Sequence, residues 1–236
     1  MKNQMIYMRC FLFTFLLFFF TNFLYTHEKQ EEKTVLIIGC AKNGTRYISK
    51  VLQQSTSLKV GHEVILKNGV VSWMMTFDTP LVPYGYARNG RKFKHIFHQV
   101  RHPLKEISSI YAVETPYSWE YIHRLIPKIS PHEDRLVQCA KYWYYWNKYA
   151  EKQAELTYRV EDLETIKNEF KNRLNITFDE DILYAPPKNI NIRHPIKNYR
   201  TWNDLKIILP NNLYRKICKL AIKYCYNKEP EMELNN

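Results

Sequence analysis

The sequence predicts an α/β domain of three layers, in which helices cover a central parallel sheet. The first observation is a continuous apolar run at residues 35–38, rich in β-branched side chains, as in a buried parallel strand. A glycine-bounded loop and an amphipathic helix follow this run directly. The second observation is that strand, turn and helix signals recur at 95–111 and at 156–174. Such alternation favours a parallel sheet.

Length and composition are those of one globular domain. The chain has 236 residues, enough for a sizeable core. Hydrophobic residues make up 45% and aromatic residues 15%, which excludes a disordered chain. The formal net charge of +12 predicts an acidic ligand, substrate or surface, without distinguishing among them.

The first 25 residues differ from the rest of the chain. Residues 10–25 carry no charge, and with their flanks they approach the length of about 20 residues that spans a bilayer. Basic residues precede this run and net acidic residues follow it, which predicts a cytosolic N-terminus. We therefore expect a cytosolic tip and signal anchor at 1–25 and a short stem at 26–33. A cleaved signal peptide is the alternative, although no Ala-x-Ala-like site is present.

The loop GCAKNGT begins at Gly39 and has the glycine spacing of a Walker A loop. That motif needs a lysine directly after the second glycine, but Thr45 stands there and the lysine is Lys42. A nucleoside triphosphate site is therefore not expected. Gly39 and Gly44 still allow a tight turn and a close approach of a ligand. The amino end of the following helix favours an anion. An ordinary turn of an unrelated α/β domain is the alternative interpretation.

The pattern GxxKxGT after a strand resembles the 5′-phosphosulfate loop of sulfotransferases, which use 3′-phosphoadenosine 5′-phosphosulfate (PAPS). A second match strengthens the resemblance: Arg101, Pro103 and Ser109 fit the family's Arg-x-Pro motif with a serine eight residues after the arginine. The resemblance implies a P-loop-like sulfotransferase fold in which Arg101 and Ser109 bind the 3′-phosphate. Arginine suits phosphate because its planar fork donates two parallel hydrogen bonds.

The resemblance also implies how the donor is held. PAPS is expected as co-substrate and no metal is expected, because Lys42 would neutralise charge on the leaving oxygen. The implied cofactor-binding residues are Gly39, Lys42, Asn43, Gly44, Thr45, Arg46, Arg101 and Ser109.

A general base is expected at the end of a short strand at 57–63. Groups at the carboxyl ends of strands line the ligand crevice of doubly wound sheets, and the resemblance implies Glu or His at this point. His62 and Glu63 both qualify. Consecutive strand residues point to opposite faces, so we expect one of them to face the site. Glu63 is favoured, with His62 orienting it or packing, and His98 is the next candidate. The alternative is a solvated turn.

The later segments are less specific. Residues 70–77 can form a helix or a strand, and 113–135 are expected to cover the site. The clearest helix is 137–154, where Trp143 and Trp146 share an apolar face. In the stretch YRVEDL, Glu161 is expected to hold structure and not to act in chemistry.

The C-terminal part is expected to be a loop, a helix and a tail. The Pro-rich basic loop at 184–204 matches, by position, the family's loop over the adenine and 3′-phosphate. A last helix follows near 213–224. The sulfotransferase domain would then span 34–228, with a flexible tail at 229–236.

Cysteines and glycosylation sequons carry little information about the site. Five cysteines are present, and their spacing suggests no zinc site. Cys218 and Cys225 lie seven apart on a predicted helix, too far to form a disulfide with each other. The sequons are at Asn43, inside the loop where a glycan would block the site, and at Asn175, the plausible acceptor.

The predicted function is sulfuryl transfer from PAPS to a hydroxyl of a glycan or another secreted acceptor. The enzyme would be a type II membrane protein, bound to the membrane through its N-terminal helix, with its domain luminal in the Golgi or extracytoplasmic. One alternative is a P-loop kinase or NTPase-like enzyme. The other is a non-catalytic, membrane-tethered binding protein for acidic glycans. No recognisable nucleic-acid module is present.

Overall fold

A computed structural model of the protein describes residues 33–84, 87–184 and 199–226. The chain divides into two units, Met1–Glu32 and Lys33–Asn236, and all described residues belong to the second. The expected tip, anchor, most of the stem and the C-terminal tail therefore lie outside the described residues, as does most of the expected basic loop. Among the helices described, none has the length and apolar character that a membrane span requires.

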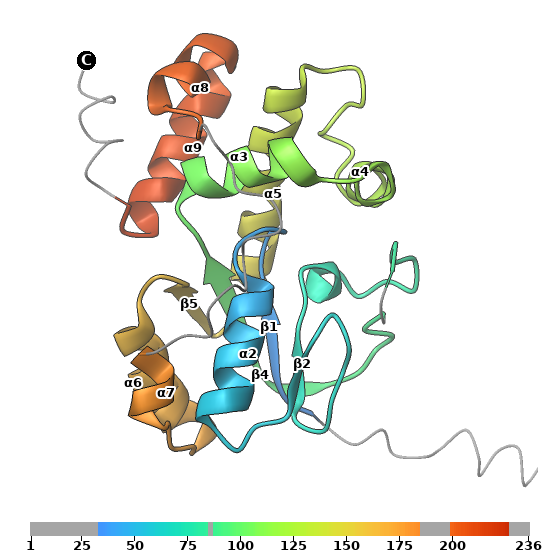
Figure 1. Ribbon diagram of the computed structural model, residues 1–236. Coiled ribbons are helices and arrows are strands. Elements are labelled where there is room, and N and C mark those ends of the chain that lie inside the picture. Colours follow the sequence, from blue (N-terminus) through green and yellow to red (C-terminus); the bar gives the residue numbers. More distant parts are fainter. Residues whose placement is uncertain (1–32, 85–86, 185–198, 227–236) are drawn as a thin grey trace, which may run out of the picture. The chain divides into compact units, whose positions relative to one another are not determined.

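The described strands form one five-stranded sheet in which every neighbouring pair is parallel, which confirms the predicted central parallel sheet (Figure 1). The strand order is β2-β3-β1-β4-β5. The apolar run predicted as a buried strand is thus the middle strand, and Val35 to Ile38 are fully buried. The strands are β1 (Lys33–Ile38), β2 (Val60–His62), β3 (Gly69–Val71), β4 (Phe93–Val100) and β5 (Leu156–Arg159).

Helices accompany these strands in the order that the sequence predicts for the strongest segments. The predicted helices after the first loop, after Arg101, and in the long aromatic stretch correspond to α2, α3 and α5. The helices are α2 (Thr45–Ser55), α3 (Pro103–Val113), α4 (Pro116–Leu125), α5 (Arg135–Gln153), α6 (Leu163–Leu174), α7 (Glu180–Tyr184), α8 (Trp202–Ile208) and α9 (Asn211–Lys223), with a 3₁₀ turn η1 (Met74–Thr76).

The two faces of β1 are covered by different helices, which gives the domain its three layers. Val35 and Ile37 belong to a core cluster with apolar residues of α2, α6 and α7. Leu36 and Ile38 point the other way and share a cluster with Ala150 of α5. This alternation is the two-residue period of a strand that is buried on both faces.

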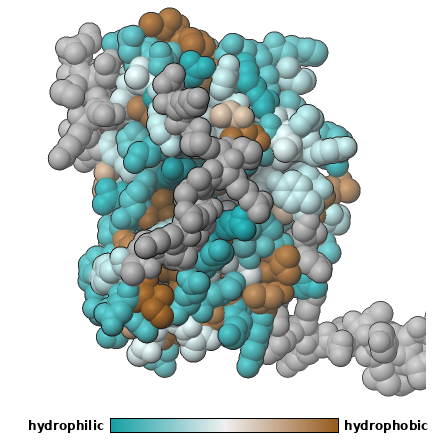
Figure 2. All heavy atoms as spheres, in the orientation of Figure 1, coloured by the Kyte–Doolittle hydropathy of each residue, from teal (hydrophilic) through white to brown (hydrophobic). Residues whose placement is uncertain are grey.

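A second body of helices packs beyond the carboxyl ends of the strands. In Figure 1, α3, α4, α8 and α9 gather around the upper half of α5, above the sheet. Their core is aromatic: the Trp146 ring centroid lies 5.4 Å from that of Trp73 and 4.9 Å from that of Tyr142. Trp143 and Trp146 are both fully buried, so they are core residues, as their helical spacing predicts. The face in Figure 2 is mostly hydrophilic, with small separate hydrophobic groups, as is usual for the surface of a folded domain.

Several segments differ in detail from the sequence interpretation. Residues 70–77 contain both a strand end and a 3₁₀ turn, because β3 stops at Val71 and η1 begins at Met74. The covering segment at 113–135 contains α4, and the end of the expected basic loop begins α8 with a capping box at Thr201. Glu161 accepts from the His102 N–H (3.3 Å) and from the Tyr226 hydroxyl (2.9 Å), which is the structural role expected for it.

Candidate functional site at the carboxyl ends of β1, β2 and β4

The loop between β1 and α2 depends on residues in left-handed conformations. Lys42 has φ 68° and Gly44, the N-cap of α2, has φ 99°. Gly39 has φ 157°, and a Cβ there would lie 2.3 Å from the Gln99 carbonyl oxygen. Glycine at position 39 is therefore required by the close approach of β4. The loop ends at the amino terminus of α2, where an anion is favoured.

Asn43 fastens this loop to β4. Its side chain is fully buried and donates from Nδ2 to the Gln99 carbonyl oxygen at 2.8 Å. The Gln99 Nε2 donates back to the Asn43 carbonyl oxygen at 3.0 Å, and the Tyr158 hydroxyl donates to Gln99 Oε1 at 2.8 Å. The Asn43 side chain thus holds the loop in place, and a buried asparagine accepts no glycan in the folded domain.

Arg101 joins the two motif segments. It follows β4 and donates from Nη1 to the carbonyl oxygen of Lys42 at 3.0 Å. Beneath it lies Glu106 of α3, which is fully buried and accepts from Trp143 Nε1 at 3.1 Å. Burial raises the pKa of Glu106 well above its usual range, and the nearby Arg101 charge opposes this shift.

The Ser109 hydroxyl is engaged within α3, although the sequence pattern pairs Ser109 with Arg101. Ser109 lies on α3, almost fully buried, and its Oγ donates to the Lys105 carbonyl oxygen at 2.7 Å. No hydrogen bond joins it to Arg101 among the residues described. Its neighbour Ser108 accepts from the Arg200 N–H at 2.8 Å, and the Arg200 guanidinium lies 4.7 Å from the centre of the Tyr111 ring.

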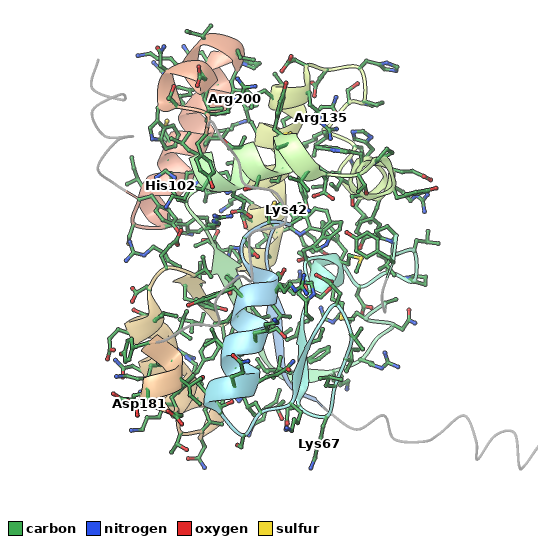
Figure 3. All side chains as sticks on the ribbon, in the orientation of Figure 1. Lys42, Lys67, His102, Arg135, Asp181 and Arg200 are labelled. Atoms are coloured by element: carbon green, nitrogen blue, oxygen red, sulfur yellow. The ribbon has the colours of Figure 1, made fainter. Side chains whose placement is uncertain are left out.

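The Lys42 side chain extends toward two carboxylates. Its Nζ lies 3.5 Å from Oε2 of Glu114, the residue that follows α3. The Lys42 charge also lowers the pKa of Glu63, so the ammonium group acts on both acids. Figure 3 shows Lys42 between the amino end of α2 and α3, whereas Lys67 lies at the opposite end of the domain.

Glu63 is the buried acid at the end of β2. Ser72 Oγ donates a short hydrogen bond to Glu63 Oε2, whereas Oε1 is buried and has no hydrogen-bond partner in the described part of the chain. Burial raises the pKa of Glu63 to about 7, and hydrogen bonds from Ser72 and from the Trp73 backbone lower it in part. A carboxylate with this pKa is suited to accept a proton near neutral pH.

His62 lies beside Glu63 and not on the opposite side. Its Nε2 is 3.7 Å from Glu63 Oε1 and 3.2 Å from Thr45 Oγ1. The expectation that the strand pleat would separate the two side chains is wrong, because Glu63 lies beyond β2 with φ 59°. Partial desolvation of the ring and the Arg46 charge lower the pKa of His62 to about 4, although the side chain is still 36% exposed, so its imidazole is neutral at neutral pH.

The remaining candidates are placed differently. Arg46 is exposed on α2, near enough to His62 for its charge to lower the pKa of that histidine. His98, the reserve candidate for the base, is fully buried on β4, with its ring nitrogens 3.0 Å from Asn147 Oδ1 and 3.2 Å from Thr157 Oγ1. Burial lowers the pKa of His98 to about 4. These contacts are those of a core histidine.

Sequence reasoning missed two residues of the site. Glu114 carries no motif signal, since its contact with Lys42 arises only when α3 packs beside the loop. Gln99 sits inside an apolar strand, where a polar residue that is fully buried must find hydrogen bonds. That burial rule is the one signal in the sequence that can single out Gln99.

The site as a whole combines a backbone loop suited to an anion, two cations and a buried acid. The cations are Lys42 of the loop and Arg101, which contacts the loop, and the acid is Glu63. Across the described part of the chain, His, Cys, Asp and Glu form no group of three or more suited to a metal ion. Comparison of the chain with protein-family models, with curated proteins and with solved structures gave no match.

Proposed function

We propose that the protein is a sulfotransferase that moves a sulfuryl group from PAPS to a hydroxyl acceptor. The hydrogen bond from Arg101 to the Lys42 carbonyl carries this proposal. This bond joins the two motif segments, which follow the neighbouring parallel strands β1 and β4. Such strand ends are where open α/β sheets bind ligands.

The loop suits the 5′-end of the donor. The backbone at Lys42 and Gly44 is left-handed, and the following N–H groups belong to the first turn of α2. Thr45 adds a hydroxyl at that turn. Arg101 is only partly buried, so its guanidinium retains donors for a 3′-phosphate while one nitrogen holds the loop. Ser109 has to rotate away from the Lys105 carbonyl before it can donate to the same phosphate.

The proposed step is an in-line displacement at sulfur. The acceptor O–H bond breaks and its proton passes to the Glu63 carboxylate, while the acceptor oxygen forms a bond to sulfur. The bond from sulfur to the bridging oxygen breaks, and that oxygen leaves on 3′-phosphoadenosine 5′-phosphate with the electron pair. The Lys42 ammonium offsets the charge that develops on this oxygen, as cations do in phosphoryl transfer.

Glu63 is the better supported base of the two candidates. Its Oε1 is buried and no described residue donates a hydrogen bond to it, and the pKa of Glu63 is about 7. A His62 with a pKa of about 4 is a much weaker base, since proton transfer is most efficient when the base has a pKa near the working pH. His62 is then a neighbour in contact with Glu63.

The acceptor and the location are proposed from the sequence. We propose a hydroxyl of a glycan or another secreted molecule, and a type II topology with the domain on the luminal or extracytoplasmic side. The N-terminal apolar run and the charge asymmetry around it support this topology.

Nucleotide binding tests the donor half of the proposal. Isothermal calorimetry is run with 3′-phosphoadenosine 5′-phosphate, with adenosine 5′-phosphate and with ATP–Mg²⁺. The wild-type domain is expected to bind the first most tightly, and Lys42→Ala to weaken it. Lys67→Ala is the matched control, because Lys67 is exposed at the far end of the domain. Tighter binding of ATP–Mg²⁺ would support a kinase or NTPase instead. Binding of acidic glycans without any nucleotide would support a tethered binding protein.

A further inference from the structure

Glu114 stands in an unusual electrostatic position for a residue outside both motifs. Its side chain is 1% exposed and comes just after the last turn of α3. Its Oε2 is buried and, among the residues that the structure describes, accepts no hydrogen bond. The Lys42 ammonium lies 3.5 Å from this oxygen. A buried carboxylate oxygen without a hydrogen bond depends strongly on a nearby cation.

The other charged groups around Glu114 do not replace Lys42. Arg135 of α5 donates from Nη2 to the Glu114 backbone carbonyl at 3.4 Å, and its guanidinium stacks 4.0 Å from the centre of the Trp119 ring. Glu63 carries the same sign as Glu114, and the Glu114 charge raises the pKa of Glu63. Lys42 is therefore shared between two acids.

Lys42 is also the group that the proposed donor needs. Its side chain is 32% exposed, so it remains accessible to a ligand in the loop. An ammonium group that turns toward a phosphosulfate leaves Glu114, because both partners require the same nitrogen. The ion pair seen here and the contact with the donor are thus alternatives.

We infer that Glu114 is a positioning residue that holds the Lys42 ammonium group away from the donor until the donor takes the place of Glu114 as the partner of that ammonium group. This inference rests on the proposed function. Donor binding then breaks the ion pair between Lys42 and Glu114. Glu114 thereby lowers the affinity for the donor nucleotide.

A double-mutant cycle tests the inference with 3′-phosphoadenosine 5′-phosphate as the probe. Glu114→Gln keeps the shape of the side chain and removes its charge. It is expected to tighten binding by about two- to fivefold, the scale of a partly exposed ion pair. In a Lys42→Met background, Glu114→Gln is expected to change the affinity by less than about twofold. Glu114→Asp restores the charge and is expected to return the affinity toward the wild-type value.

Controls separate this effect from a loss of structure. Glu120→Gln on α4 removes an exposed carboxylate that pairs with Arg124, and it is expected to leave the affinity unchanged. Unfolding temperatures are measured for every variant. Unchanged or weaker binding in Glu114→Gln, or tightening that persists without Lys42, overturns the inference alone. No binding of the nucleotide to the wild-type protein overturns the proposed function and the inference with it.

Discussion

Arg101 donates a hydrogen bond from Nη1 to the backbone carbonyl of Lys42 at 3.0 Å. The two residues come from different strand–turn–helix segments, which pair in parallel through β1 and β4. A cation on the second segment thereby supports the conformation of the loop lysine on the first. Any ligand that spans both segments meets a single preformed surface, which reduces the ordering cost of binding.

Replacement of Arg101 is expected to act mainly on the 3′-phosphate. Arg101→Ala should weaken the binding of 3′-phosphoadenosine 5′-phosphate by about 10–150-fold, the equivalent of a lost charge-assisted bond of about 1.5–3 kcal/mol. The binding of adenosine 5′-phosphate, which has a 3′-hydroxyl, should weaken much less, because this nucleotide loses only the support that Arg101 gives to Lys42. Calorimetry on both nucleotides measures the difference, with Arg173→Ala on α6 as a surface control. Equal weakening would show that Arg101 does not read the 3′-phosphate.

Turnover is expected to depend on Glu63 far more than on His62. Glu63→Gln should retain nucleotide binding and lower kcat by about 10²–10⁴-fold, the usual contribution of a general base. His62→Asn should cost much less. In the wild type, kcat/KM should rise with pH and level off above about 7, as Glu63 loses its proton. Transfer of labelled sulfate measures these rates. Activity that survives Glu63→Gln and collapses with His62→Asn would reverse the roles. If both variants stay active while Lys42→Ala is inactive, the base lies elsewhere.

Glu63 should also make stability depend on pH. Its pKa is raised from 4.5 in the unfolded chain to about 7 in the fold, because burial disfavours the charged form. Between these pH values the folded state binds more protons than the unfolded chain. The stability that protonated Glu63 contributes is therefore fully present below pH 4.5 and is lost as the pH rises through about 7. Glu63→Gln should therefore stabilise the protein at pH 8 by on the order of 2–3 kcal/mol and much less at pH 5. Urea unfolding at both pH values measures this, and equal effects at the two would contradict it.

The N-terminal run is expected to anchor the protein in the membrane. After expression in a eukaryotic secretory host, the full chain should stay in the pellet on alkaline carbonate extraction. A C-terminal tag should resist protease in intact vesicles, as the charge asymmetry predicts. Release of the protein into the carbonate supernatant, or digestion of the tag, would speak against a signal anchor of this orientation.

Of the two sequons, we expect the one at Asn175 to carry a glycan and the one at Asn43 to carry none. Asn175 is exposed at the end of α6, whereas Asn43 is fully buried. In the same host, glycosidase treatment should reduce the mass of the wild-type protein and of Asn43→Gln. It should leave Asn175→Gln unchanged. A glycan on Asn43 would mean that modification precedes folding of the loop.

Most of the central sheet and part of the site can be predicted from the sequence. The apolar run of β1, the glycines of the loop and the Arg-x-Pro segment are local patterns, and the parallel sheet and the helices after them follow from such patterns. The meeting of His62 and Glu63 was not predictable, because it depends on the left-handed backbone at Glu63. The pairing of Lys42 with Glu114 is a tertiary contact between segments distant in sequence. α8 has only seven residues, too few for a periodic pattern to predict a helix.

The burial of Asn43 has a consequence for the chemical ageing of the protein. Asn43 precedes Gly44, and Asn–Gly is the dipeptide in which the next backbone nitrogen most readily attacks the side-chain amide and expels ammonia. In the fold, the carboxamide of Asn43 is held by Gln99 in both directions, and no water reaches it. Deamidation of Asn43 therefore requires that the hydrogen bonds between the loop and β4 break first. It accumulates only in molecules in which the loop has separated from β4.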